Sequence, residues 1–415
     1  MPRTVGSRLL ATLPLIFLLF STLIIRVEGQ AAQVDCPDSN LTTYLLALID
    51  TLYNNGLTYY ESLLATLSES DDGYRLLESW YTDHDHLTLF APTDAAFQQA
   101  GLAPPFGSLS SKAIVGIVAY HAAMGQWGYA SLPEAPKKGF ADTMLRLKDW
   151  VDPTAAVNST AHAPLVLQQG DKGAISIRLA TGNATTWGWV INGGKDVWNV
   201  DIIPIDTVMP LPPKLSQALT LGTTSRSIKG LPEFQKALDS AGGAKQLEPL
   251  TEGGFTIFAP IDDAFTPETH KALSSEASVK ILGNHYATNY SLFSRIWVDN
   301  GPYDLPVLSG STLRIQQADT GATVSLGNQS VRILRSDVVL ENGVMHIIED
   351  VLADPRVVAA AATMSGTAAH PSSTGTGTGQ PTTTVKKSDA EALRLASDWC
   401  LAALIAVGMI SVYVG

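Results

Sequence analysis

Apolar and polar positions alternate in two short runs that lie 168 residues apart, at Leu87–Phe90 and Phe255–Phe258. Such alternation predicts short, buried β-strands. Pro92 and Pro260 follow these runs. Because proline has no N–H to donate to a strand ladder, each run is expected to end there.

Both runs belong to one repeated motif. Of the eight positions that begin at Phe90 and at Phe258, six are identical. The motif positions are Phe90, Pro92, Asp94 and Phe97 in the first copy and Phe258, Pro260, Asp262 and Phe265 in the second. The aspartate suits the start of a helix, where a carboxylate accepts free amide hydrogens. The second phenylalanine is expected to turn back toward the core.

The flanks of the motif repeat as well. Amphipathic helical patterns precede it at Leu57–Trp80 and Leu231–Leu250, and an apolar helix that ends in histidine follows it at Ile114–His121 and Val279–His285. The second copy then continues with short alternating runs separated by Gly, Asn and Asp, which predict strands joined by tight turns. These runs are Thr312–Ile315, Thr323–Leu326, Val331–Leu334 and Gly343–Leu352.

The repeated motif, the histidine in the middle of each copy (His121 and His285) and the closing Asn-Gly-Val-x-His346-Ile-Ile resemble the fasciclin domain. The first copy departs from that pattern, because Ile203 stands where the second copy has His346. The resemblance covers about Asp35–Pro355. It implies an α+β fold of two tandem fasciclin-type domains, each a twisted β-sandwich or wedge with several packed helices.

The expected organisation follows from these boundaries. Domain 1 is expected at 35–212, with an insert at about 151–192, and domain 2 at 213–355. Before them, Arg3 and Arg8 precede an apolar run and small residues up to Gly29, a pattern that indicates a signal peptide at 1–29. An uncleaved signal anchor is the alternative.

After the domains, residues 356–388 form a Ser/Thr/Gly-rich segment that is typical of an O-glycosylated stalk. Small residues at Ser388 and Ala390, a short spacer and the apolar run Trp399–Gly415 indicate a glycosylphosphatidylinositol (GPI) attachment signal. Ser388 is the expected attachment residue and 389–415 the propeptide that is removed. A membrane helix at the tail end is the alternative.

Composition agrees with an extracellular globular protein. The 415 residues carry a formal net charge of −12, which argues against nucleic acid as a partner. Of the two cysteines, Cys400 lies in the expected propeptide, so Cys36 is expected to remain as a free thiol. N-glycosylation sequons occur at Asn40, Asn158, Asn183, Asn289 and Asn328.

Candidate chemistry is sparse. The sequence shows no nucleophile elbow, zinc-protease motif or phosphate loop, so we expect no enzyme and no cofactor. Asp83-His-Asp-His86 could ligate a metal, but a solvated turn is the preferred interpretation, because alternate residues near a strand point to opposite faces. In animal fasciclin proteins a Tyr-His pair in this region is linked to integrin contact. The resemblance therefore implies a partner contact at Tyr120 and His121, with core packing as the alternative.

These observations favour a GPI-anchored glycoprotein at the cell surface. Its tandem domains are expected to mediate adhesion to extracellular matrix, cell wall or cell-surface molecules. One alternative is a carbohydrate- or lipid-binding module, with Trp187 and Trp189 as stacking residues. Another is a vacuolar or other endomembrane protein that acts in membrane traffic.

Overall fold

The computed structural model describes residues 38–82, 85–146, 162–186, 190–192, 197–222, 229–240, 254–289 and 291–364. Helices and two β-sheets alternate in these ranges, which confirms the predicted α+β class. The chain divides into two compact units, Met1–Thr367 and Ala368–Gly415, and every described residue lies in the first. Below, the part that contains the first sheet is the first half, and the part that contains the second sheet is the second half.

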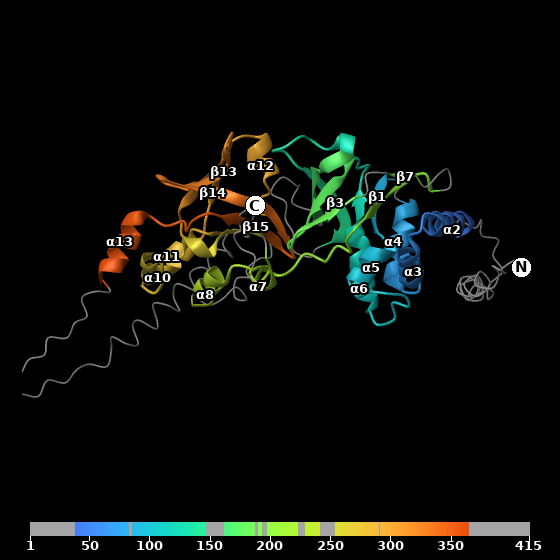
Figure 1. Ribbon diagram of the computed structural model, residues 1–415, viewed down its shortest axis with the longest axis horizontal. Coiled ribbons are helices and arrows are strands. Elements are labelled where there is room, and N and C mark those ends of the chain that lie inside the picture. The colour runs from blue at the N-terminus through green and yellow to red at the C-terminus, as the bar shows by residue number, and fades with distance from the viewer. Residues whose placement is uncertain are drawn as a thin grey trace, which may run out of the picture. The chain divides into compact units, whose positions relative to one another are not determined.

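Helices of the first half gather beside its first strand, in the blue and cyan part of Figure 1. They are α2 (Asp38–Asn54), α3 (Thr58–Leu67), α4 (Asp71–Thr82), α5 (Asp94–Gln99) and α6 (Ser111–His121). The single helix predicted over Leu57–Trp80 is two helices in the structure. Ser70 Oγ accepts the Gly73 N–H at 3.1 Å and so starts the second of them.

The sheet of the first half has the strand order β6-β5-β4-β3-β2-β1-β8-β7. Its strands are β1 (Leu87–Pro92), β2 (Ala122–Met124), β3 (Gly139–Arg146), β4 (His162–Gln169), β5 (Ile175–Arg178), β6 (Asn183–Thr185), β7 (Ile191–Asn192) and β8 (Val200–Ile205). Strand β1 ends at Pro92, as predicted, and it pairs in parallel with β8. Short 3-10 turns lie at η1 (Tyr129–Ser131) and η2 (Asp171–Gly173).

The second half repeats this plan with the strand order β10-β9-β15-β14-β13-β12-β11. Its strands are β9 (Phe255–Pro260), β10 (Tyr286–Thr288), β11 (Tyr303–Pro306), β12 (Thr312–Ala318), β13 (Gly321–Leu326), β14 (Gln329–Leu340) and β15 (Gly343–Ile348). Its helices are α7 (Leu215–Ala218), α8 (Pro232–Ser240), η5 (Asp262–Ala264), α10 (Pro267–Leu273), α11 (Ser278–Gly283), α12 (Arg295–Asp299) and α13 (Pro355–Met364). The strands predicted from alternation in this copy are confirmed as β12 to β15.

Strand register confirms the alignment of the two copies. Phe90 lies opposite Ile203 in the parallel pair β1–β8, and Phe258 lies opposite His346 in the parallel pair β9–β15. Ile203 therefore occupies the place of His346, as the sequence predicted.

The range predicted as an insert, 151–192, holds strands β4 to β7 where the structure describes it. These strands have counterparts in the second half. Ile191 pairs with Ile202 as Val338 pairs with Met345, so β7 matches the end of β14. What distinguishes the first half is that two short strands, β6 and β7, stand where the second half has one long strand.

Each sheet has apolar clusters on both faces, which explains why the central strands are buried throughout. In β1, Leu89 packs with the helices α2 to α6, whereas Phe90 packs toward Leu165 and Ile177 of the curled far strands. In β9, the neighbouring residues Ile257 and Phe258 likewise point to opposite faces, so Ile257 packs in one apolar cluster and Phe258 in another. This packing of a curled sheet onto itself, with helices on the outer face, is the predicted twisted sandwich.

Candidate functional site

His121 ties the end of helix α6 to the closing segment of the first half. Its Nδ1 lies 2.7 Å from the Ile117 carbonyl oxygen, and its Nε2 accepts the Met209 N–H at 3.0 Å. Because Nε2 accepts, the proton sits on Nδ1, which donates to the carbonyl. Burial lowers the pKa of His121 to about 4, although the bond to Ile117 opposes the shift.

His285 makes the same clasp in the second half. Its Nδ1 donates to the Ile281 carbonyl at 2.8 Å, and its Nε2 accepts the Leu352 N–H at 2.9 Å. Burial lowers the pKa of His285 to about 4 as well. Both ring nitrogens of each histidine are thus used by backbone groups, so these side chains fasten the fold as neutral imidazoles.

His346 is a third buried histidine, and the first half lacks it. Its Nδ1 accepts the Asp337 N–H at 3.2 Å, and its Nε2 donates to the Leu292 carbonyl at 2.9 Å. The ring stacks on Phe258 at 5.3 Å between centroids, and Trp297 meets its edge. Burial lowers the pKa of His346 to about 4, against the opposing effect of Asp337.

The motif aspartates cap a different helix from the one predicted. Thr93, not Asp94, caps the helix that follows the motif, since its side chain accepts the Ala96 N–H. Asp94 instead accepts the Tyr59 N–H at 2.8 Å and the Thr58 hydroxyl at 2.5 Å, at the start of α3.

In the second half, Asp262 likewise accepts the Glu233 N–H at 3.2 Å, at the start of α8. The prediction of a capping role was right, but the prediction of which helix was wrong. The fold brings an earlier helix to the aspartate, and sequence spacing does not reveal this.

Replacing Asp94 with Ala should lower the free energy of unfolding by about 1–2 kcal/mol, because α3 loses its cap. Asp262→Ala, which removes a single longer bond, should cost less. Urea unfolding followed by circular dichroism measures both. An Asp94→Ala variant as stable as the parent would contradict this capping role.

Tyr120 and His121, the predicted partner contact, both lie inside the first half. Tyr120 is 3% exposed and His121 is 0% exposed. Core packing was the alternative interpretation, and it agrees with the hydrogen bonds that both ring nitrogens of His121 make to backbone groups. The partner contact stays a prediction, and the structure gives these two side chains almost no surface to offer.

The cluster predicted as a solvated turn, Asp83–His86, is described only at its last two residues; Asp83 and His84 lie outside the described part. His86 Nε2 is 3.8 Å from a carboxylate oxygen of the buried Asp201, which also accepts from Gln126 Nε2 at 2.8 Å. Among the described residues, no group of three or more His, Cys, Asp or Glu side chains could hold a metal ion.

Three of the predicted sequon asparagines are exposed on the described surface. Asn183 lies on β6, Asn289 follows β10, and Asn328 sits in the turn between β13 and β14. The side chains of Asn40 and Asn158 lie outside what the structure describes. Exposure allows glycan attachment, but occupancy stays a prediction.

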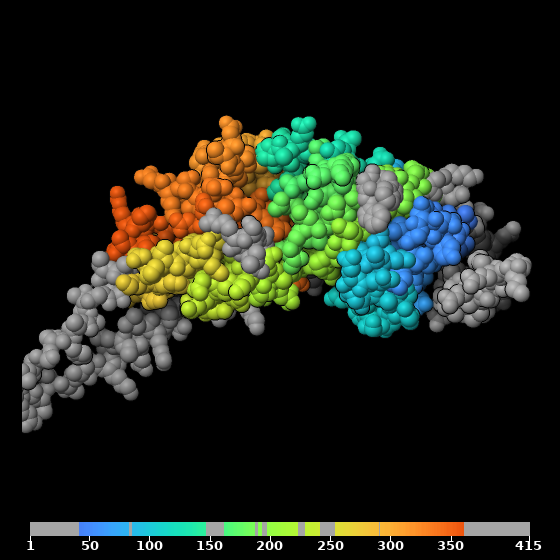
Figure 2. Space-filling view, in the orientation of Figure 1, coloured from blue at the N-terminus to red at the C-terminus, as the bar shows by residue number. Residues whose placement is uncertain are grey.

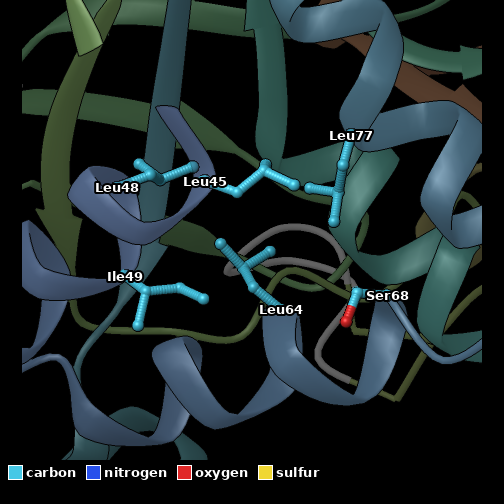
Figure 3. Close-up of a pocket in the computed structure, with 6 residues that line it drawn as sticks. All are labelled: Leu45, Leu48, Ile49, Leu64, Ser68 and Leu77. Atoms are coloured by element: carbon cyan, nitrogen blue, oxygen red, sulfur yellow. The ribbon is translucent and has the colours of Figure 1, made fainter. Parts of the chain in front are cut away.

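A small apolar pocket lies between helices α2, α3 and α4 (Figure 3). Leu45, Leu48, Ile49, Leu64, Ser68 and Leu77 line it. Its cavity volume is about 10 Å³, roughly the room needed for one water molecule. A sugar ring or an acyl chain would not fit there. Trp187 and Trp189, the residues predicted to stack on a sugar, lie outside the described residues.

The predicted signal peptide (1–29), most of the stalk, Ser388 and the propeptide (389–415) also lie outside the described residues. Within the described part, no helix is long and apolar enough to span a membrane. Cleavage and lipid attachment therefore stay predictions.

Comparisons with known proteins find similarity to fasciclin-domain proteins. The fasciclin domain family model matches residues 229–354. A fasciclin-like arabinogalactan protein of Phaeosphaeria nodorum, elcF, is 24% identical over 299 residues, which cover 71% of this chain and 86% of that protein. This alignment is longer than the second half, so it extends into the first. The fasciclin-like arabinogalactan protein CTB11 of Cercospora beticola is 31% identical over 150 residues, 36% of each chain.

Among solved structures, a FAS1 domain pair from the insect cell adhesion molecule Fasciclin I is 18% identical and covers 74% of this chain and 99% of its own, with a TM-score of 0.33. The family assignment rests on the sequence match and not on this superposition. Residues 229–354 of the chain therefore match the fasciclin domain family.

Proposed function

We propose that this chain is a cell-surface glycoprotein that makes adhesive contacts with extracellular matrix, cell wall or other cells through tandem fasciclin domains. Its role is contact, not catalysis. The matched fasciclin domain supports the adhesive part. The names of the two fungal relatives, which are arabinogalactan proteins, support the glycoprotein part.

The observation that carries the proposal is the repetition of one fasciclin plan in both halves. The first half lies outside the family match, yet it has the same parallel pair of central strands, the same aspartate cap and the same histidine clasp. Two such domains in one chain offer two contact surfaces, and paired contacts strengthen weak binding without any new interaction.

The anchor and the adhesion can be tested together on intact cells that express the full chain. We expect a phosphatidylinositol-specific phospholipase to release the protein and to abolish the attachment of these cells to immobilised matrix or wall material. A chain that ends at residue 388 is the control, because it should appear in the medium without enzyme.

Retention on the cells after treatment would overturn the lipid anchor and favour a membrane helix in an endomembrane. Release without any loss of attachment would overturn the adhesive role.

Glycosylation is tested separately at the exposed sequons. Asn183→Gln, Asn289→Gln and Asn328→Gln should each lower the apparent mass of the secreted chain by one glycan, since these side chains are open to solvent. Endoglycosidase treatment should bring all variants to the same mass. A set of variants that migrate like the parent before treatment would contradict occupancy at these three sites.

A further inference from the structure

Asp337 is a buried carboxylate at an irregular point of strand β14. The pairing of β14 with β15 shifts between Arg335 and Val338, and Asp337 has a left-handed backbone with φ of 64°. Its two carboxylate oxygens accept the Ser294 N–H at 2.7 Å and the Ser294 hydroxyl at 2.6 Å. Its side chain is 0% exposed. A carboxylate in such a position is costly unless a cation accompanies it.

The cation comes from the other half of the chain. Lys138, immediately before β3, places its ammonium group against the Asp337 carboxylate and donates to Ser336 Oγ at 2.6 Å. The lysine side chain is only 8% exposed. Burial acts to raise the pKa of Asp337, but Lys138 and the hydrogen bonds outweigh it and lower the pKa to about 2.

Apolar side chains from both halves enclose this pair. Val166 and Phe140 of the first half form one cluster with Phe293, Val339 and Val344 of the second. The Phe140 and Phe293 rings meet edge to face, with 5.6 Å between centroids. These contacts, together with the Lys138–Asp337 pair, are called the junction here. In Figure 2 the first half is coloured from blue to green and the second half from yellow-green to red.

A second cation reaches across the junction in the opposite direction. The Arg335 guanidinium of the second half donates to the carbonyl oxygens of Leu179 and Ala180 in the first. Arg335 also attracts the Asp337 carboxylate, as does Arg178 of the first half. By contrast, Lys137 and Asp299 form an ion pair at 3.0 Å that remains about half exposed.

The junction uses a face that differs between the two copies. Val339 and Val344 are paired residues on β14 and β15, and their register counterparts in the first half are Asn192 and Asp201. The same face is apolar in the second copy and polar in the first. Domain contact of this kind is thus built into one copy only.

We propose that Lys138 is the residue that allows the two halves to close into one body, because it compensates the Asp337 charge that closure buries. Arg335 and Arg178 also attract Asp337, but without Lys138 closure would bury the carboxylate without its hydrogen-bonded cation, and opening would return it to water. The apolar contacts attract the two halves to each other, but they can form only when the Lys138–Asp337 ion pair offsets the cost of burying the carboxylate. This inference does not depend on what the surface of the protein binds.

Paired spin labels on the full mature chain test the proposal. Gln99 and Thr320 are exposed positions, one in each half, and both can be changed to Cys for labelling once Cys36→Ser has removed the remaining thiol. The parent should give one narrow distance distribution. Lys138→Met, which keeps an unbranched side chain only one atom shorter and removes its charge, should broaden it. Hydrogen exchange at the junction strands should become faster by on the order of a hundredfold.

Two further variants make the outcome decisive. Lys137→Met removes the exposed neighbouring pair and should leave the distribution narrow. Lys138→Met combined with Asp337→Asn removes both charges, and Asn tolerates the left-handed backbone, so the junction should close again. Circular dichroism confirms that each variant is folded. A narrow distribution in Lys138→Met, or a double variant as broad as the single one, would overturn the proposal.

Discussion

Acidification from pH 7 to pH 5 should destabilise the second half of the protein by about 4 kcal/mol and the first half by about 2 kcal/mol. The difference arises because the second half holds two buried histidines, His285 and His346, whereas the first holds His121. The pKa of each is lowered to about 4 by burial. Ile203, in the place of His346, is the reason for the asymmetry.

The sign follows from where the protons bind. An unfolded histidine has a pKa near 6.5, so below that pH the unfolded chain takes up protons that the folded chain refuses. The contribution of each histidine to stability is complete above pH 6.5 and falls as the pH drops toward 4. At pH 5 the loss is about 2 kcal/mol for each histidine.

Other groups also contribute in the same pH window. The pKa of His162 is lowered by burial, which adds a smaller loss in the first half because the ring is partly exposed. Burial raises the pKa of Glu61 and of Asp262, and these carboxylates oppose the loss at the acid end. Asp337, with a pKa of about 2, keeps its charge throughout this window.

Hydrogen exchange with mass spectrometry, corrected for the intrinsic rate at each pH, resolves the two halves in the full chain. His121→Gln is the control, because glutamine keeps a donor and an acceptor but does not titrate. This variant should lose most of the pH dependence of the first half, leaving the part due to His162, and retain that of the second. Equal losses in both halves of the parent would contradict the assignment of the effect to these histidines.

Phe97→Ala should reduce the free energy of unfolding by about 3–5 kcal/mol. The Phe97 side chain is 0% exposed, and its ring packs against Phe106 and Tyr60 at centroid distances of 5.7 and 6.3 Å. Removing the ring leaves a cavity that these neighbours cannot fill, because they are themselves fixed in the core.

The matching residue of the second copy gives an internal comparison. Phe265 is 9% exposed, and the one aromatic neighbour described for it is His270 at 5.9 Å, so Phe265→Ala should cost less than Phe97→Ala. Gln99→Ala, at an exposed position of the same helix as Phe97, should stay within about 0.5 kcal/mol of the parent. Denaturant unfolding measures all three. A Phe97→Ala loss no larger than that of Gln99→Ala would contradict its place in the core.

The sequence pattern was enough to predict those elements that are determined by residues close together in the chain. The run up to Pro92 predicted a strand that stops there, because alternation and the missing N–H of proline act within a few residues. The sequence also predicted that Ile203 aligns with His346, because the two copies have the same order of elements. The break between α3 and α4 was missed, because the amphipathic pattern continues across Ser70.

The candidate site was predictable only in part. The sequence identified His121 and His285 as equivalent, but not that their partners are backbone amides of Met209 and Leu352, 88 and 67 residues away. Neither Lys138 nor Asp337 carries any local signal. They stand 199 residues apart, and each resembles an ordinary surface charge.

The sequence by itself determined the repeated strand, proline stop and helix, the α+β class and the resemblance of the second half to the fasciclin domain. Those features follow from residue spacing and backbone chemistry within short segments. Only the tertiary structure decided which helix Asp94 caps, that Tyr120 is buried, and that Lys138 meets Asp337. These depend on burial and on contacts between distant segments, which arise only when the folded chain removes charge and apolar surface from water.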